Sequence, residues 1–230
     1  IKEICNEYDL WFHIDGAYGA PAAASNLATD ELKYLNIADS IAMDPHKWLY
    51  SALEVGCTLV KDPKHLRDTF SHNPAYYEFG KQDFEIDYHE YGLQNSRGFR
   101  ALKVWLGFKL LGREGFVSLI DKDIILSQKL AKMIIDHPQL ELYSNHLSIT
   151  TFRYIHTEYS SDPQKYLDEI NEVNKEILHK IYESGEAFIS NAYVDEKYLL
   201  RACLVNFRTQ EKHLDIMLSL VESFAADITL

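Results

Sequence analysis

The sequence has few cysteines, few basic residues and no long apolar run. Its three cysteines, Cys5, Cys57 and Cys203, lie far apart and form neither a CxxC pair nor a zinc-type spacing with histidine. We therefore expect reduced thiols and a cytoplasmic location. No apolar stretch approaches the ~20 residues of a membrane helix, and the first residues do not resemble a signal peptide. These absences predict a protein without a disulfide framework or a membrane span.

The charge balance is acidic. Lys and Arg number 23 against 35 Asp and Glu, which gives a formal net charge of −12 at pH 7. Nucleic-acid binding needs clustered basic residues, so a nucleic-acid partner is not expected. The composition, 47% hydrophobic and 25% charged, is that of an ordinary globular protein with a sizeable core. The 230 residues allow one or two domains.

The first part of the chain predicts an α/β fold. Short apolar runs at 11–14, 40–43 and 55–60 indicate buried strands of a mostly parallel sheet. A helical period begins at Ser96 and ends near Gly112, and a second helix is expected from about 114 to 136. The stretch between, 70–95, is aromatic and weakly periodic, which is typical of a functional or disordered loop.

The second part predicts a small α+β domain. Residues 147–155 are β-branched and aromatic, which favours a strand. A helix is expected between Asp162–Pro163 and Gly185. Two strands near 187–193 and 198–206 and a final amphipathic helix complete the pattern.

Two motifs carry the chemistry. Asp15 follows an apolar strand, and Lys47 stands in the turn Pro45-His46-Lys47-Trp48. Pyridoxal phosphate chemistry needs a carboxylate that keeps the pyridine nitrogen protonated and a lysine that holds the cofactor as a Schiff base. The pair therefore predicts a pyridoxal phosphate site.

Residues 11–19 and 38–49 resemble the signature of the group II pyridoxal-phosphate-dependent amino-acid decarboxylases, a family that includes aromatic-amino-acid, glutamate and diaminobutyrate decarboxylases. The resemblance continues through 96–103 and 200–202. It implies the fold type I architecture of aspartate aminotransferase and a homodimer. It also implies that residues 1–112 are the C-terminal part of the cofactor-binding large domain and 113–230 the small C-terminal α+β domain. Because the family's phosphate loop and ring-stacking residue lie upstream of these motifs, we expect the chain to be the C-terminal part of an enzyme.

The resemblance also assigns roles. Lys47 would bind the cofactor, Asp15 would pair with the ring nitrogen, Ala17 would lie against a ring face, and His46 would point toward the phosphate or the imine. Lys47, Asp15 and His46 each have a structural alternative: a surface lysine, a turn or cap residue, and a packed histidine that only orients the turn. Asp44 stands where some members have Asn, and no phosphate contact is assigned to it because an acid would repel the phosphate.

Tyr76 aligns with the family's loop tyrosine, which returns a proton to the substrate carbon. Tyr77 takes this role if the alignment is shifted by one residue. The structural alternative is that Tyr76 only packs within the loop. Arg201 resembles an arginine that reaches substrate or cofactor from the small domain, with an exposed strand arginine as the alternative. Many relatives have an arginine where this chain has Gly98, which removes one expected cation beside Arg97.

The predicted function is the decarboxylation of an L-amino acid to its amine and carbon dioxide, within amino-acid metabolism. Two alternatives stay open. One is an aldehyde-forming or carbon–carbon lyase relative of the same fold. The other is a non-catalytic fragment or pseudoenzyme that acts only as a dimerisation module. His13 is interpreted as a core histidine, and the acidic residues show no metal-binding pattern.

Overall fold

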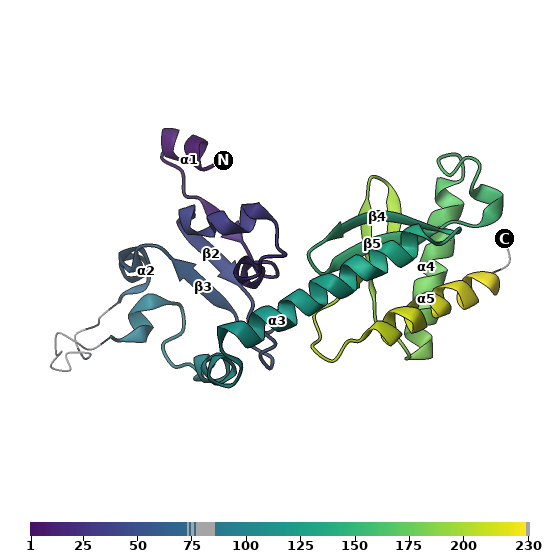
Figure 1. Cartoon of the computed structure of the whole chain (residues 1–230). Coiled ribbons are helices and arrows are strands. Elements are labelled where there is room, and N and C mark those ends of the chain that lie inside the picture. Colours follow the sequence, from purple (N-terminus) through teal and green to yellow (C-terminus); the bar gives the residue numbers. More distant parts are fainter. Residues whose placement is uncertain (73, 75, 77–85, 229–230) are drawn as a thin grey trace. The chain divides into compact units, whose positions relative to one another are not determined.

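The computed structural model describes residues 1–72, 74, 76 and 86–228. The chain forms two compact units, Ile1–Phe116 and Val117–Leu230 (Figure 1). Assignment of 1–112 and 113–230 to a cofactor domain and a small domain stays a prediction.

The first unit is built on a three-stranded sheet of order β1-β2-β3. β1 (His13–Asp15) pairs with β2 (Ser40–Met43) in parallel, whereas β2 pairs with β3 (Cys57–Val60) antiparallel. The expected mostly parallel sheet thus carries an antiparallel strand, which is common at the edge of such sheets. The remaining elements of this unit are α1 (Lys2–Glu7), η1 (Ala20–Ala24), η2 (Asp30–Ile37), α2 (Pro63–Phe70), η4 (Tyr88–Tyr91) and the start of α3.

β1 and β3 are not buried in the described part of the chain, which differs from the sequence-based expectation. His13 and Asp15 of β1 are exposed, and so are Thr58 and Leu59 of β3. The apolar runs predicted strands correctly, but the described residues do not cover both faces of this sheet. His13, expected in the core, is exposed in the described part of the chain, and its Nδ1 atom lies 2.7 Å from the hydroxyl oxygen of Ser40.

A long helix, α3 (Ala101–Ile135), crosses from one unit into the other. Gly112 interrupts it with a φ of 62° and a ψ of −177°, so the predicted break between two helices is confirmed. The first helix begins at Ala101 rather than after Ser96. Arg97 explains the delay, because its guanidinium donates to the backbone oxygens of Tyr88 and Gln94 and holds the preceding segment in an irregular loop.

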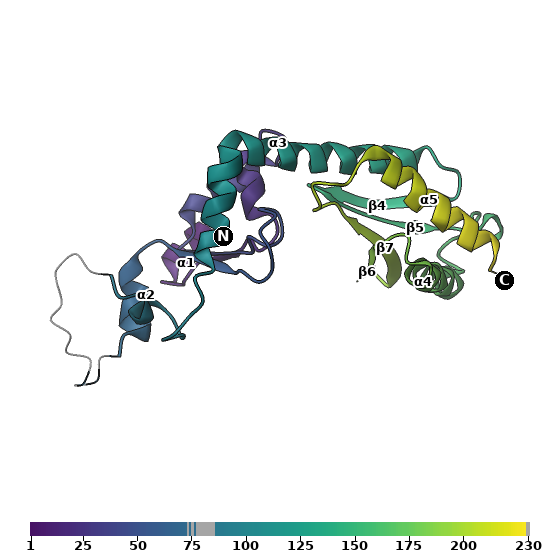
Figure 2. The ribbon, with the colours of Figure 1, turned by 90° about the horizontal axis from the view of Figure 1, so that it is seen from below.

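The second unit is the predicted small α+β fold. Its sheet has the order β4-β5-β7-β6 and is antiparallel throughout. The elements are β4 (Leu140–His146), β5 (Ile149–Tyr154), η5 (Thr157–Tyr159), α4 (Leu167–Ser184), β6 (Ser190–Val194), β7 (Lys197–Cys203) and α5 (Glu211–Ala226). Figure 2 shows α4 and α5 beside these strands. One hydrophobic core joins Phe152, Leu200, Ile177 and Val221 with Leu130 of α3.

The sequence analysis did not predict α2, β4 or the short 3-10 helices. In α2, Asp62 accepts from the backbone of Lys64 and Pro63 occupies the first turn, so residues interpreted as the end of a strand also cap a helix. The half-buried strand β4 alternates too weakly to be recognised. Among the described residues, no helix combines the length and apolarity needed to cross a membrane.

Candidate active site

The two predicted motifs follow neighbouring parallel strands. Asp15 is the last residue of β1 and pairs with Ala42 of β2. Just beyond the strands, the Asp44 backbone N–H donates to the Ala17 carbonyl over 3.0 Å. The loop that carries Asp15 and Ala17 is therefore bonded to the turn that carries Lys47. The carboxyl ends of parallel strands are the usual position of ligand sites in α/β sheets.

Gly16 allows this close approach. A Cβ atom at this position would lie 2.7 Å from the Ala20 Cβ atom and 3.1 Å from the Ala42 carbonyl oxygen. The Gly16 N–H instead donates to that same oxygen over 3.0 Å. Only a residue without a side chain leaves room for both contacts.

Asp15 combines a fixed backbone with an exposed carboxylate. Its Oδ1 atom accepts from the Ala17 N–H over 3.0 Å, an Asx turn that orients the side chain. Asp15 is exposed, whereas Ala17 is half-buried. One carboxylate oxygen is thus held by the loop, and the carboxylate remains accessible to a partner.

The turn that carries Lys47 is anchored by its neighbours. Trp48 is fully buried and its ring lies 5.0 Å from that of Tyr18. The Lys47 N–H donates to the Asp44 carbonyl, and the Lys47 carbonyl accepts from the Tyr50 N–H. Because Trp48 points into the unit, its neighbour Lys47 is left with a side chain 39% exposed.

Lys47 forms an ion pair that the sequence analysis did not foresee. Its Nζ atom lies 2.9 Å from Oδ2 of Asp44, whose side chain is 28% exposed. Asp44 therefore acts on the lysine itself. The ion pair joins the end of the Lys47 side chain to the turn that carries it.

His46 makes one well-defined bond. Its Nδ1 atom lies 2.7 Å from the Val55 carbonyl oxygen, and the ring is 24% exposed. A carbonyl has no proton to donate, so Nδ1 carries the hydrogen and the neutral ring keeps its lone pair on Nε2. That Nε2 atom lies 3.9 Å from Oδ2 of Asp44.

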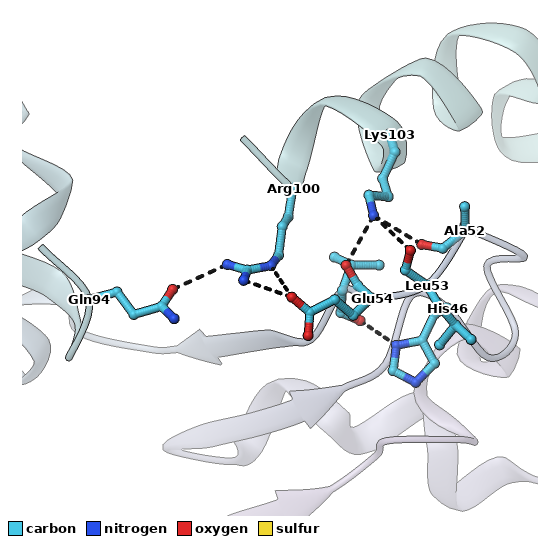
Figure 3. A network of polar contacts seen from close by, with 8 residues as sticks. His46, Ala52, Leu53, Glu54, Gln94, Arg100 and Lys103 are labelled. Carbon is cyan, nitrogen blue, oxygen red and sulfur yellow. Dashed lines mark hydrogen bonds and ion pairs between the residues drawn. The ribbon is translucent and has the colours of Figure 1, made fainter. Parts of the chain in front are cut away.

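The Val55 carbonyl belongs to the segment 52–55. Two basic residues at the start of α3 bind this segment (Figure 3). The Lys103 ammonium donates to the carbonyls of Ala52, Leu53 and Glu54 over 3.2, 3.3 and 3.1 Å. Arg100 donates to the Glu54 carboxylate over 3.0 and 2.7 Å. The hydrogen bond from Arg100, with its charge, lowers the pKa of Glu54.

Sequence reasoning missed these two cations, although 96–103 belongs to the stretch that resembles the family. Their spacing of i and i+3 at a helix start is a signal that both side chains share a face. The loop they bind lies about fifty residues earlier in the chain, which no local pattern reveals.

The roles assigned to all these site residues stay predictions, including those of Tyr76 and Arg201. Tyr76 is 76% exposed, and Tyr77 lies outside the described residues. Arg201 lies on β7 of the second unit, where its Nη1 atom is 3.4 Å from the Ser190 hydroxyl oxygen. Within the described ranges, no cluster of three His, Cys, Asp or Glu residues has the arrangement of a metal site.

The three cysteines are free thiols. Cys57 pairs with Met43 across β2 and β3, next to the Lys47 turn. Burial raises the pKa of the Cys57 thiol. Burial also raises the pKa of Cys203, although the nearby charge of Arg201 opposes this shift. Neither thiol has the lowered pKa of a catalytic nucleophile.

Comparison with known proteins identifies the family. Residues 1–155 match the pyridoxal-dependent decarboxylase conserved domain. The chain is also 37% identical over 234 residues to an aromatic-L-amino-acid decarboxylase of Bacillus atrophaeus, which covers 100% of this chain and 48% of the relative. The chain belongs to the pyridoxal-dependent decarboxylase family, as its motifs predicted.

Further relatives support the fold and show the range of the family. A phenylacetaldehyde synthase of a Rosa hybrid cultivar is 28% identical and covers 98% of this chain and 45% of the relative. The crystal structure of Catharanthus roseus tryptophan decarboxylase in complex with L-tryptophan matches with a TM-score of 0.83 at 26% identity, covering 98% of this chain and 46% of that one. The predicted α/β architecture of fold type I is thereby confirmed. The chain spans about half the length of the relatives it matches.

Proposed function

We propose that the full-length protein containing this chain is a pyridoxal-phosphate-dependent decarboxylase of an L-amino acid. The observation that carries the proposal is the joining of the Asp15 loop to the Lys47 turn at the ends of two parallel strands. Family membership supports the same cofactor and reaction.

The residues present fit this cofactor in their chemistry. Asp15 offers an exposed carboxylate that can pair with a protonated ring nitrogen, and Lys47 offers a partly exposed primary amine that can bond to an aldehyde carbon. Ala17 presents a small side chain beside Asp15. When bound, pyridoxal phosphate supplies an electron sink that stabilises the charge left on the substrate carbon.

The chain's own residues would each do one task. The Asp15 carboxylate, oriented by the Ala17 N–H, would keep a positive charge on the ring nitrogen. Lys47 would hold the cofactor and be displaced by the substrate amine. His46 would present the lone pair of Nε2, since its Nδ1 proton is bound to the Val55 carbonyl. Asp44 would stabilise the ammonium of Lys47 whenever the lysine is released.

An aldehyde-forming activity is the second candidate, because a relative at 28% identity carries that activity in its name. Tyr76 favours the decarboxylase. A phenol that returns a proton to the substrate carbon yields the amine, whereas its absence leaves that carbon open to oxygen.

The substrate and assembly belong to the same proposal. Aromatic L-amino acids are the first substrates to test, because the relative at 37% identity is named for them. We also propose a homodimer, tested by light scattering of the full-length protein, and a cytoplasmic location, for which the three free thiols are the support.

Borohydride reduction tests the cofactor role directly. The full-length protein is incubated with pyridoxal phosphate, reduced and digested, and the modified lysine is identified by mass spectrometry. A stoichiometric label on Lys47 is expected. A label on Lys61 instead, or no label, would exclude the proposed site.

A further inference from the structure

Lys103 occupies an unusual position for a charged side chain. Its ammonium has three protons, and three successive carbonyl oxygens, those of Ala52, Leu53 and Glu54, lie within 3.1–3.3 Å of it. The donors and acceptors thus match in number. The contact depends on the backbone of 52–54 and not on its side chains, so it fixes the path of the chain there.

The next carbonyl along the same segment is the one that binds His46. Figure 3 shows Lys103 on one side of the segment and the His46 ring on the other. Val55 is itself buried. Because Glu54 is tied through its carbonyl to Lys103 and through its carboxylate to Arg100, the direction of the Val55 carbonyl is fixed from α3.

We propose that Lys103 is a positioning residue of the active site, which holds the Val55 carbonyl on Nδ1 of His46 and so keeps the lone pair of His46 on Nε2, the nitrogen that faces the Asp44 carboxylate paired with Lys47. This inference rests on the proposed function for its catalytic meaning. The contact itself is a property of the cofactor-free chain. Hydrogen-bonded partners of this kind commonly set the tautomer of a functional histidine.

The first test needs no cofactor. Two-dimensional NMR of the ring nitrogens of ¹⁵N-histidine-labelled protein distinguishes the two tautomers, and His46→Gln assigns the His46 signal. The parental protein should show the Nδ1–H tautomer. Lys103→Met, which keeps the aliphatic stem but removes the charge, should shift the His46 signal toward a mixture of tautomers. An unchanged His46 signal in this variant would overturn the proposal.

Lys109→Met is the matched control. Lys109 lies on the same helix, and its ammonium is 5.5 Å from the centre of the Trp105 ring. The same change of residue there should leave the His46 signal and the kinetics unaltered. Equal effects of the two variants would mean that α3 acts only through its general stability, and would refute a specific role for Lys103.

The second test uses the loaded full-length enzyme. Lys103→Met should lower kcat by about 10- to 100-fold, as loss of such a supporting contact does elsewhere, with KM changed less than twofold. Lys103→Cys alkylated with bromoethylamine restores an ammonium at nearly the lysine length and should recover most of the lost kcat. The parental protein treated in the same way controls for alkylation of Cys57 and Cys203. Failure of the restored ammonium to recover kcat in a folded variant would count against the proposal.

The proposed function and the role of Lys103 can be refuted independently. If borohydride does not label Lys47, the proposed function falls, while the NMR experiment still decides whether Lys103 sets the tautomer. If Lys47 is labelled but Lys103→Met behaves as Lys109→Met does, only the role of Lys103 is refuted.

Discussion

The carboxylate of Asp44 lies 2.9 Å from the ammonium of Lys47, the residue whose free amine the proposed chemistry requires. The nitrogen that would bond to an aldehyde is therefore engaged by a neighbouring carboxylate in the cofactor-free chain. Asp44 thus contacts the lysine that is proposed to bind the cofactor.

Asp44→Asn should make Lys47 more reactive. Because the ion pair must open before the amine can react, and exposed ion pairs contribute ~0.2–1 kcal/mol, the rate of Lys47 acetylation should rise by about 1.5- to 5-fold. Competitive labelling with acetic anhydride, read by mass spectrometry, measures this rate against the other lysines of the cofactor-free protein. Asp30→Asn is the control, because Asp30 forms an ion pair of the same i,i+3 spacing with Lys33. That variant should raise the rate at Lys33 and leave Lys47 unchanged; equal labelling of Lys47 in all proteins would contradict the role of Asp44.

Gly16→Ala should destabilise the first unit. The new Cβ atom would meet the Ala20 Cβ atom at 2.7 Å and the Ala42 oxygen at 3.1 Å, and such overpacking costs about 1–3 kcal/mol. All three tryptophans, Trp11, Trp48 and Trp105, lie in this unit, so urea unfolding followed by tryptophan fluorescence reports on it alone.

The control for this variant is Gly98→Ala, where a Cβ atom would meet nothing within 4 Å. Its unfolding midpoint should stay within experimental error of the parental one. Equal midpoints for the variants at positions 16 and 98 would show that the loop after β1 can move away from β2.

Part of this arrangement was readable from the sequence. Asp15 and Lys47 each follow an apolar strand, and the carboxyl ends of neighbouring parallel strands meet at one edge. The helix that ends at Gly185 and the final helix were recognised because their apolar faces keep a regular period and are buried in one core. In these segments local pattern and tertiary packing agree.

The rest depends on contacts that no local pattern contains. Lys103 binds backbone carbonyls about fifty residues earlier in the chain. Asp44 was considered only as a possible contact of the cofactor phosphate, and its ion pair with Lys47 was not predicted. Burial was overestimated for β1 and β3. An apolar run shows that a strand has side chains suited to a core, but it does not show which other elements pack against them. Phe99, Leu106 and Leu110, apolar residues of the segment predicted to be helical, are likewise exposed.

The Glu54–Arg100 contact should make the stability of the first unit depend on pH. Arg100 lowers the pKa of Glu54 in the folded state, so the unfolded chain takes up the proton first as the pH falls from neutral. The contact therefore stabilises the fold above the ordinary glutamate pKa of ~4.3, and this contribution is lost as the pH falls through the lowered folded-state pKa. The difference in tryptophan-monitored unfolding free energy between the parental protein and Glu54→Gln should be present at neutral pH and vanish in acid. A difference that does not change with pH would show that the carboxylate charge plays no part.

Tyr76→Phe tests the role on which the choice between amine and aldehyde depends. The variant of the full-length protein should bind cofactor and substrate as before but form amine about 100-fold more slowly, if the phenol returns the proton to the substrate carbon. Molecular oxygen should then accept the electrons from that carbon, so aldehyde, ammonia and hydrogen peroxide should rise together. Amine and peroxide assays on the same sample measure both branches, and Tyr88→Phe, at another exposed tyrosine of the same stretch, should alter neither. If Tyr77→Phe causes the switch and Tyr76→Phe does not, the predicted register is wrong by one residue. If neither does, proton return belongs to another group.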